Sequence, residues 1–149
     1  MRKRLVLTVS VASFVLAVFS AVSGAVAGAA FAEEVKDPSY AVKVDVPATK
    51  AGQHAIVKLH VKPGAGYHMN RDFPVGVTLA PTAGVTTDKA HLGKADAARF
   101  EDTGADFDVG LVAAASGKQV VTAEMKFAVC SATACEPKRE KVSFTLEVK

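Results

Sequence analysis

From residue 40 onward, apolar and polar side chains alternate in short runs separated by turn residues. The first run is Tyr40–Val46, and the later ones are 55–61, 75–79, 107–115, 120–129 and 142–148. Alternation with a period of two is typical of a strand with one buried face and one exposed face. No run keeps a helical period, so the pattern predicts antiparallel sheets rather than a helical or α/β fold.

Glycine and proline mark the ends of these runs. Turns are predicted at 47–52, at Pro63-Gly64, at Pro81 and at 116–118. The segment 90–106 is the least regular and holds either one short helical turn or a loop. Six or seven short strands in a chain of this length predict an immunoglobulin-like antiparallel β-sandwich. The chain has no Trp, so it lacks the buried tryptophan of antibody domains.

The N-terminus has the organisation of a secretory signal. A positive cluster at 1–4 precedes an uncharged stretch at 5–32, which ends in Ala30-Phe31-Ala32 with small residues at the positions that a signal peptidase recognises. The sequence predicts a signal peptide at 1–32, cleaved after Ala32. A retained membrane anchor is the alternative, because the uncharged stretch is longer than the roughly 20 residues that span a bilayer.

Either alternative places residues 33–149 outside the cytoplasm, in the periplasm or secreted. These 117 residues are enough for one domain with its own core. Residues 33–39 are expected to form a short mobile lead-in. Three of the 18 basic residues lie in the leader, which leaves 15 basic and 15 acidic residues in the domain. This balance gives no electrostatic reason to expect binding to nucleic acid or to anionic membranes.

Cys130 and Cys135 are the only cysteines of the chain and lie between the last two predicted strands. Thiols in an oxidising compartment normally form disulfides. If the two strands form a hairpin, the cysteines face each other across its tip at a separation that suits a disulfide. A bridge that closes so short a loop contributes only about 2 kcal/mol to stability. Because the bond adds so little stability, one interpretation is a redox-active disulfide. The alternative is a static hairpin disulfide.

Four charged residues follow the second cysteine. Lys138 and Arg139 would lower the pKa of a thiol if they folded back, whereas Glu136 and Glu140 would oppose that effect. The sequence leaves open which cysteine attacks.

Two segments carry a resemblance to a known family. One is 63–74, in which Tyr67, His68 and Asn70 precede Phe73-Pro74, and the other is 127–137, in which the cysteine pair is followed by Pro137. With these two segments in this order and spacing, the mature chain resembles the N-terminal periplasmic domain of DsbD-type thiol:disulfide interchange proteins. It also resembles the related disulfide bond corrector domains. The likeness covers about 40–149. The shorter cysteine spacing and the absence of an aromatic residue beside Cys135 depart from the family. Because residues 1–149 hold no membrane or thioredoxin domain, the electron donor is expected to be a separate protein.

The resemblance implies an immunoglobulin-like fold and a cysteine pair that cycles between dithiol and disulfide. It implies a membrane-embedded electron donor and periplasmic thioredoxin-like proteins as partners, and a role as a component of protein-disulfide reduction. It also implies a loop that covers the pair, in which Tyr67 or Phe73 is the cap and His68 and Asn70 support the loop. No cofactor is expected. The sequence gives neither the direction of electron flow nor the oligomeric state.

Two other kinds of site are weaker alternatives. His68 and Met69 adjoin and suit copper, but the other histidines are scattered, at 54, 60 and 91. The acidic residues at 101–108 do not have the spacing of a calcium-binding loop and are expected to form a solvated acidic loop. The remaining alternative function is an exported β-sandwich for protein interaction with a static hairpin disulfide.

Overall fold

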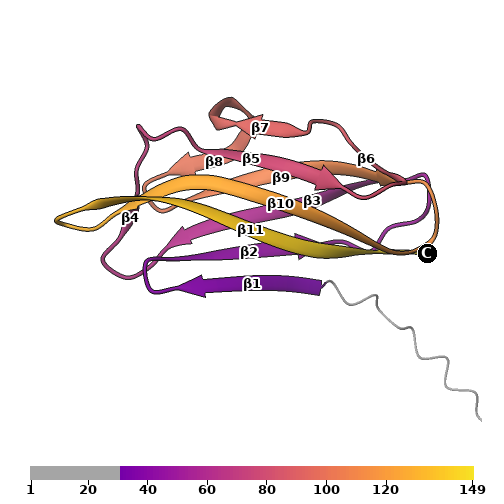
Figure 1. Cartoon of the computed structure of the whole chain (residues 1–149), viewed down its shortest axis with the longest axis horizontal. Coiled ribbons are helices and arrows are strands. Elements are labelled where there is room, and N and C mark those ends of the chain that lie inside the picture. Colours follow the sequence, from indigo (N-terminus) through magenta and orange to yellow (C-terminus); the bar gives the residue numbers. More distant parts are fainter. Residues whose placement is uncertain (1–30) are drawn as a thin grey trace, which may run out of the picture.

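The computed structural model describes residues 31–149, and they form two antiparallel sheets packed face to face (Figure 1). The first sheet has the order β1-β2-β3-β9-β6, and β8 also pairs with β9. Its strands are β1 (Phe31–Asp37), β2 (Tyr40–Val46), β3 (His54–Pro63), β6 (Val85–Thr87), β8 (Ala97–Glu101) and β9 (Gly104–Ala113). This architecture confirms the predicted immunoglobulin-like β-sandwich.

The second sheet has the order β11-β10-β5-β7, and β4 also pairs with β10. Its strands are β4 (His68–Met69), β5 (Gly76–Pro81), β7 (His91–Gly93), β10 (Gly117–Cys130) and β11 (Cys135–Val148). A single 3-10 turn, η1 (Lys94–Asp96), lies between β7 and β8. No helix in the part of the chain from residue 31 onward is long and apolar enough to cross a membrane.

The core forms because alternate residues of both sheets point inward. In β2 the buried positions are Tyr40, Val42, Val44 and Val46, which is the period expected from the sequence. Three phenylalanines from different strands are at most 2% exposed and fill the centre: Phe107, Phe127 and Phe144. Their burial supplies the large apolar contacts that tryptophan provides in antibody domains.

The predicted lead-in at 33–39 is wrong, because these residues belong to an ordered hairpin. β1 pairs with β2 from Phe31↔Val46 to Asp37↔Tyr40. The hairpin turn is closed by Asp37, whose Oδ1 accepts hydrogen bonds from Ser39 N at 2.8 Å and from Ser39 Oγ at 2.5 Å. Val35 packs against the core. Residues 1–30 of the predicted signal peptide lie outside the described residues.

Two further segments differ from the sequence-based expectation. The segment 90–106 contains the short helical turn, but β7, β8 and the start of β9 replace the expected loop. The predicted turn at 116–118 is present as a bend at 114–116, and it connects β9 of one sheet to β10 of the other. β10 begins at Gly117, whose φ of +112° favours glycine at this sharp connection.

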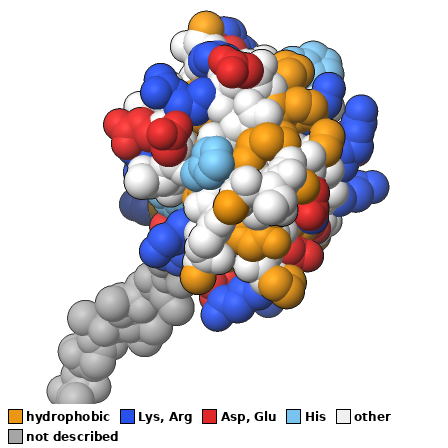
Figure 2. Space-filling model, turned by 90° about the vertical axis from the view of Figure 1, so that its left-hand side faces the viewer, with side chains coloured by type: hydrophobic (Ala, Val, Ile, Leu, Met, Phe, Trp, Pro, Cys, Tyr) orange, Lys and Arg blue, Asp and Glu red, His pale blue; other side chains and the backbone are white. Residues whose placement is uncertain are grey.

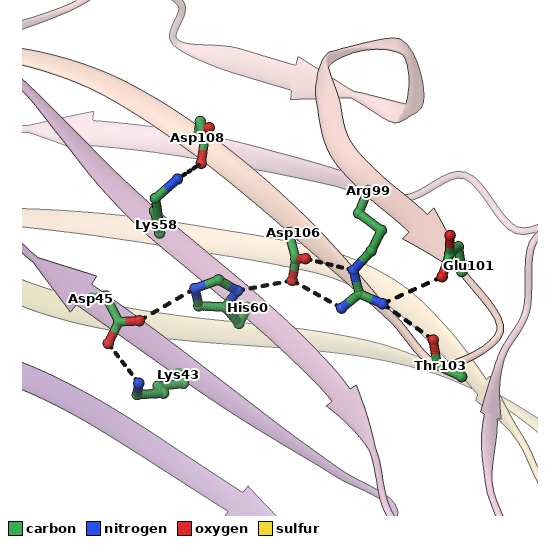
Figure 3. A network of polar contacts seen from close by, with 9 residues as sticks. All are labelled: Lys43, Asp45, Lys58, His60, Arg99, Glu101, Thr103, Asp106 and Asp108. Atoms are coloured by element: carbon green, nitrogen blue, oxygen red, sulfur yellow. Dashed lines mark hydrogen bonds and ion pairs between the residues drawn. The ribbon is translucent and has the colours of Figure 1, made fainter.

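A row of polar side chains crosses the outer face of the first sheet (Figure 3). His60 on β3 lies between two carboxylates, with Nδ1 2.8 Å from Asp106 and Nε2 3.3 Å from Asp45. Arg99 on β8 donates from Nε to Asp106 at 2.6 Å. Partial burial raises the pKa of Asp106, but the hydrogen bonds from Arg99 and His60 outweigh this effect. They hold the pKa of Asp106 below its ordinary value. The row therefore ties four strands together on the solvent side.

Candidate functional site

The candidate site is the tip of the β10–β11 hairpin, which projects beyond the end of the sandwich (Figure 1). The two strands pair without interruption from Gly117↔Val148 to Cys130↔Cys135. The cysteines are thus the last directly opposed pair, with Cα atoms 3.9 Å apart, and they are joined by a disulfide. Directly opposed strand positions bring side chains close enough for this bond. The predicted hairpin and disulfide are therefore present.

Ser131 organises the turn between the cysteines. Its backbone N–H donates to the carbonyl of Ala134 at 2.8 Å. Its hydroxyl accepts hydrogen bonds from the backbone N–H groups of Thr133 and Ala134 at 3.3 and 3.2 Å. Serine at the first position of a turn commonly bonds to the backbone in this way. The sequence carried this signal, but the residue was not among the predicted site residues.

The two cysteines differ sharply in exposure. Both side chains lie on the outer face of the second sheet, because the neighbouring positions Val129 and Phe127 point into the core. Cys130 is nevertheless only 4% exposed, whereas Cys135 is exposed. Cys135 is therefore the cysteine that solvent reaches, and Cys130 is shielded by its neighbours.

One of these neighbours is β4, a two-residue strand on the free side of β10. Its register places His68 opposite Cys130 and Met69 opposite Val129. Asn70 continues the contact, because its backbone N–H donates to the carbonyl of Ala128 at 2.9 Å. The predicted loop is thus attached to the strand that carries Cys130, although 60 residues separate them in the sequence.

The remaining predicted loop residues have distinct positions. Asn70 shapes the loop, because its Oδ1 accepts hydrogen bonds from the backbone of Asp72 and of Phe73 at 3.0 and 3.2 Å. The half-buried ring of Phe73 lies 5.3 Å from Nζ of Lys126. Lys126 is four residues before Cys130 on β10, about 13 Å along a strand. Phe73 therefore covers the strand below the disulfide, and Tyr67 packs against the core.

A glycine turn sets the position of this loop. Gly64 N donates to the carbonyl of Ser39 at 2.8 Å. A Cβ atom at Gly64 would lie 2.2 Å from the carbonyl oxygen of Pro38, so only glycine fits against the β1–β2 turn. Gly66 follows with a φ of +80°. The loop therefore leaves β3 in a fixed direction and reaches β10 beside the disulfide.

The four charged residues that follow Cys135 do not fold back onto it. Lys138 Nζ is 2.7 Å from Glu136, and hydrogen bonding to this carboxylate raises the pKa of Lys138. Arg139 pairs with Glu124 at 2.9 Å, and Glu140 accepts a hydrogen bond from the Tyr40 hydroxyl at 2.5 Å. Each charge is thus held by a partner along the hairpin or in the facing sheet.

An open hollow of about 260 Å³ lies beside β4. It is lined by Lys62, Pro63, Tyr67, His68, Asp102 and Thr103. Figure 2 shows the end of the molecule that carries the hairpin tip, where hydrophobic side chains lie between charged ones. Such a mixed surface can contact a protein partner without a deep pocket.

The alternative metal sites are not assembled. Met69 is 1% exposed and points into the core, whereas the opposite face carries His68, so the two cannot share an ion. Within residues 31–149, no three His, Cys, Asp or Glu side chains converge on one point. The expected acidic loop is partly wrong, because Asp106 and Asp108 lie on β9 and form ion pairs, Asp108 with Lys58 at 2.8 Å.

The sequence matches no known family model and no curated protein. Among solved structures, the chain is similar to the GAE domain of GGA2p from Saccharomyces cerevisiae, with 12% identity and a TM-score of 0.50 over 78% of this chain and 97% of that one. AggA, the major subunit of aggregative adherence fimbriae type I from Escherichia coli, is 8% identical over 78% and 99%, with a TM-score of 0.39. A PapD-like domain of human CEP192 is 13% identical over 93% and 94%, with a TM-score of 0.36. The likeness concerns the fold alone.

Proposed function

We propose that this protein is a periplasmic thiol–disulfide exchange module, which relays an electron pair through the Cys130–Cys135 disulfide. The observation that carries the proposal is the unequal exposure of the two cysteines. They lie at the tip of a hairpin that the pairing of β10 with β11 already holds together. A bond that closes so short a loop adds little to stability. Its accessible position is the one that exchange chemistry requires.

The exchange begins with attack by a partner thiolate on the sulfur of Cys135. The bond between the two cysteines breaks, a mixed disulfide forms between the partner and Cys135, and Cys130 leaves as a thiolate. A second thiol of the partner then attacks the partner's own sulfur in the mixed disulfide. This step releases Cys135 as a thiolate, so the partner is oxidised to a disulfide and this protein is reduced to a dithiol.

The loop 68–74 has a supporting role in this proposal. Its attachment to β10 at Cys130 and Ala128 shields one side of the pair, while the side of Cys135 stays open. This arrangement directs a partner to one sulfur. The resemblance to DsbD-type domains suggests a membrane-embedded electron donor and periplasmic thioredoxin-like acceptors as the partners, and the predicted signal peptide suggests export.

Redox titration of the purified protein tests the proposal. The fraction of disulfide is measured by mass spectrometry after alkylation in dithiothreitol buffers of defined potential. A midpoint above about −300 mV supports exchange, because structural disulfides lie below that value. A lower midpoint would favour the alternative, an exported interaction module with a static disulfide.

A matched pair of variants tests which sulfur is attacked. Cys130→Ala keeps the exposed thiol, and Cys135→Ala keeps the buried one. The first is expected to form a mixed disulfide with an aromatic disulfide reagent much faster than the second, because only the sulfur of Cys135 can be approached directly. Equal rates for the two variants would contradict the assignment.

A further inference from the structure

The position of His68 suggests a further participant in the proposed exchange. His68 and Cys130 are direct partners in the β4–β10 register. Direct partners in an antiparallel pair project to the same face with Cβ atoms about 4.5–5.5 Å apart. The side chain of His68 therefore leaves β4 next to Cys130, on the side opposite Cys135, which is the register partner on the other strand. The three side chains form one row across β4, β10 and β11.

Cys130 is the buried member of this row, whereas His68 and Cys135 are exposed. Cys130 is on the outer face and yet only 4% exposed, so neighbouring groups cover it. His68 itself is exposed and can exchange protons with water. A thiolate that forms at Cys130 would be removed from solvent, which raises its free energy unless a cation or an acid lies next to it.

His68 also differs from the other three histidines in its hydrogen bonding. His54 is held by Asp88 at 2.7 Å, His60 by Asp106 at 2.8 Å, and His91 by Thr78 at 3.2 Å. Within the described part of the chain, the ring of His68 takes part in no hydrogen bond or ion pair of this kind. Its nitrogens are free to serve the neighbouring sulfur.

We propose that His68 is the proton donor to Cys130, the sulfur that leaves when a partner attacks Cys135. As the disulfide breaks, the imidazolium of His68 stabilises the departing thiolate of Cys130 and transfers its proton to it, which leaves a neutral imidazole and a thiol. Water returns a proton to the imidazole. In the reverse direction the imidazole takes the thiol proton, and the thiolate of Cys130 attacks Cys135 in a mixed disulfide. This assignment rests on the proposed function.

Other titratable or charged groups also surround this row, and they define its electrostatic setting. They are Lys62, Tyr67 and Asp102, which line the same hollow as His68, and Lys126 and Arg139, which project from β10 and β11 to the face of the row. Arg139 is paired with Glu124 at 2.9 Å, and Lys126 lies against Phe73. Glu136 and Lys138 project to the opposite face, because their register partners Val129 and Phe127 point into the core. Unlike these groups, an imidazole is a side chain that can both give and take a proton in the physiological range of pH.

The test compares reduction of the disulfide by dithiothreitol in the wild-type protein and in His68→Gln over pH 5–9. The titration of dithiothreitol cancels in the ratio of the two rates. We expect wild type to be about tenfold faster below pH 6, because lowering the pKa of a leaving thiol speeds its departure. The ratio should fall toward one at high pH, where the imidazole no longer carries a proton to give. A ratio that does not change with pH would overturn the proposal.

His91→Gln is the matched control. His91 lies on the same sheet opposite Thr78, which pairs with Glu124, six residues before Cys130. This variant is expected to match wild type at every pH. If His91→Gln shows the same pH-dependent loss as His68→Gln, the effect does not come from the neighbour of Cys130 and the proposal fails.

A second measurement does not depend on the proposed function. The thiolate absorbance of Cys130 near 240 nm is titrated in Cys135→Ala and in Cys135→Ala with His68→Gln. A neighbouring imidazolium should lower the thiol pKa in the first protein by about one unit relative to the second. Equal titrations would overturn the role of His68 even if the disulfide exchanges readily. A difference would support it even if the redox midpoint of wild type lies in the structural range.

Discussion

Reduction of the Cys130–Cys135 disulfide is expected to leave the sandwich folded at a small and calculable cost. The bond closes a loop of six residues from Cys130 to Cys135, for which the chain-entropy relation gives about 2 kcal/mol at 25 °C. For a domain of this size, an unfolding entropy of about 2.1 cal/mol/K per residue turns that loss into a fall of about 9 °C in Tm. The pairing of β10 with β11 from Gly117 to Cys130 holds the hairpin without the bond.

The assay is urea-induced unfolding followed by circular dichroism, with and without dithiothreitol, together with thermal melts. Cys130→Ala with Cys135→Ala serves as a permanently reduced form, and its unfolding should differ from that of the reduced protein only by the small change of packing at Cys130. A reduced protein that is unfolded, or that loses more than about 4 kcal/mol, would refute the reasoning. The disulfide would then be a staple that the fold requires.

Three substitutions elsewhere have directions and sizes that follow from the structure. Phe127→Ala should cost about 3–5 kcal/mol, because it empties the centre of the core. Gly64→Ala should cost about 1–3 kcal/mol, because its Cβ meets a backbone carbonyl. Asp106→Asn should cost about 1 kcal/mol at pH 7, since its ion pairs are partly exposed. Its lowered pKa stabilises the fold above the ordinary carboxyl pKa, and this contribution should disappear as the pH falls below about 4.

Urea unfolding measures each of these effects, and the chain offers matched controls. Gly93→Ala should be nearly neutral, because nothing lies within 4 Å of the added Cβ. Val120→Ala should change stability by less than about 0.5 kcal/mol, since Val120 is 45% exposed. A stability of Asp106→Asn that follows the same pH dependence as wild type between pH 5 and 2 would contradict the role given to that carboxylate.

The sequence predicted the fold where burial follows the local pattern. The bounds of β2 coincide with the alternating run 40–46, because every second residue from Tyr40 to Val46 is buried. The pattern failed for β1, an edge strand whose charged residues outnumber its apolar ones, since pairing with β2 orders it. The charged run 136–141 was likewise not expected to be strand, and it extends β11 because it follows β10 residue by residue.

The site was predictable in part for a related reason. Two cysteines flanked by strands on either side indicate a hairpin disulfide, because the pairing is local. Which cysteine is exposed depends on β4, and the approach of β4 to β10 joins His68 to Cys130 across 62 residues. The alternation of apolar and polar residues within one segment does not reveal which residues of β4 and β10 are paired. It follows from the packing of the two sheets and from the direction in which the loop leaves Gly64.

The position of β11 at the edge of its sheet affects how readily the protein aggregates at high concentration. β11 is the terminal strand, and an open margin of this kind invites strand addition by a second copy, the first step toward fibres. Here Pro137 offers no N–H, and Arg139 and Lys141 bring positive charge to the same stretch. These residues disfavour strand addition beside Cys135, so the exposed cysteine lies on a stretch of edge that is poorly suited to pairing with a second copy.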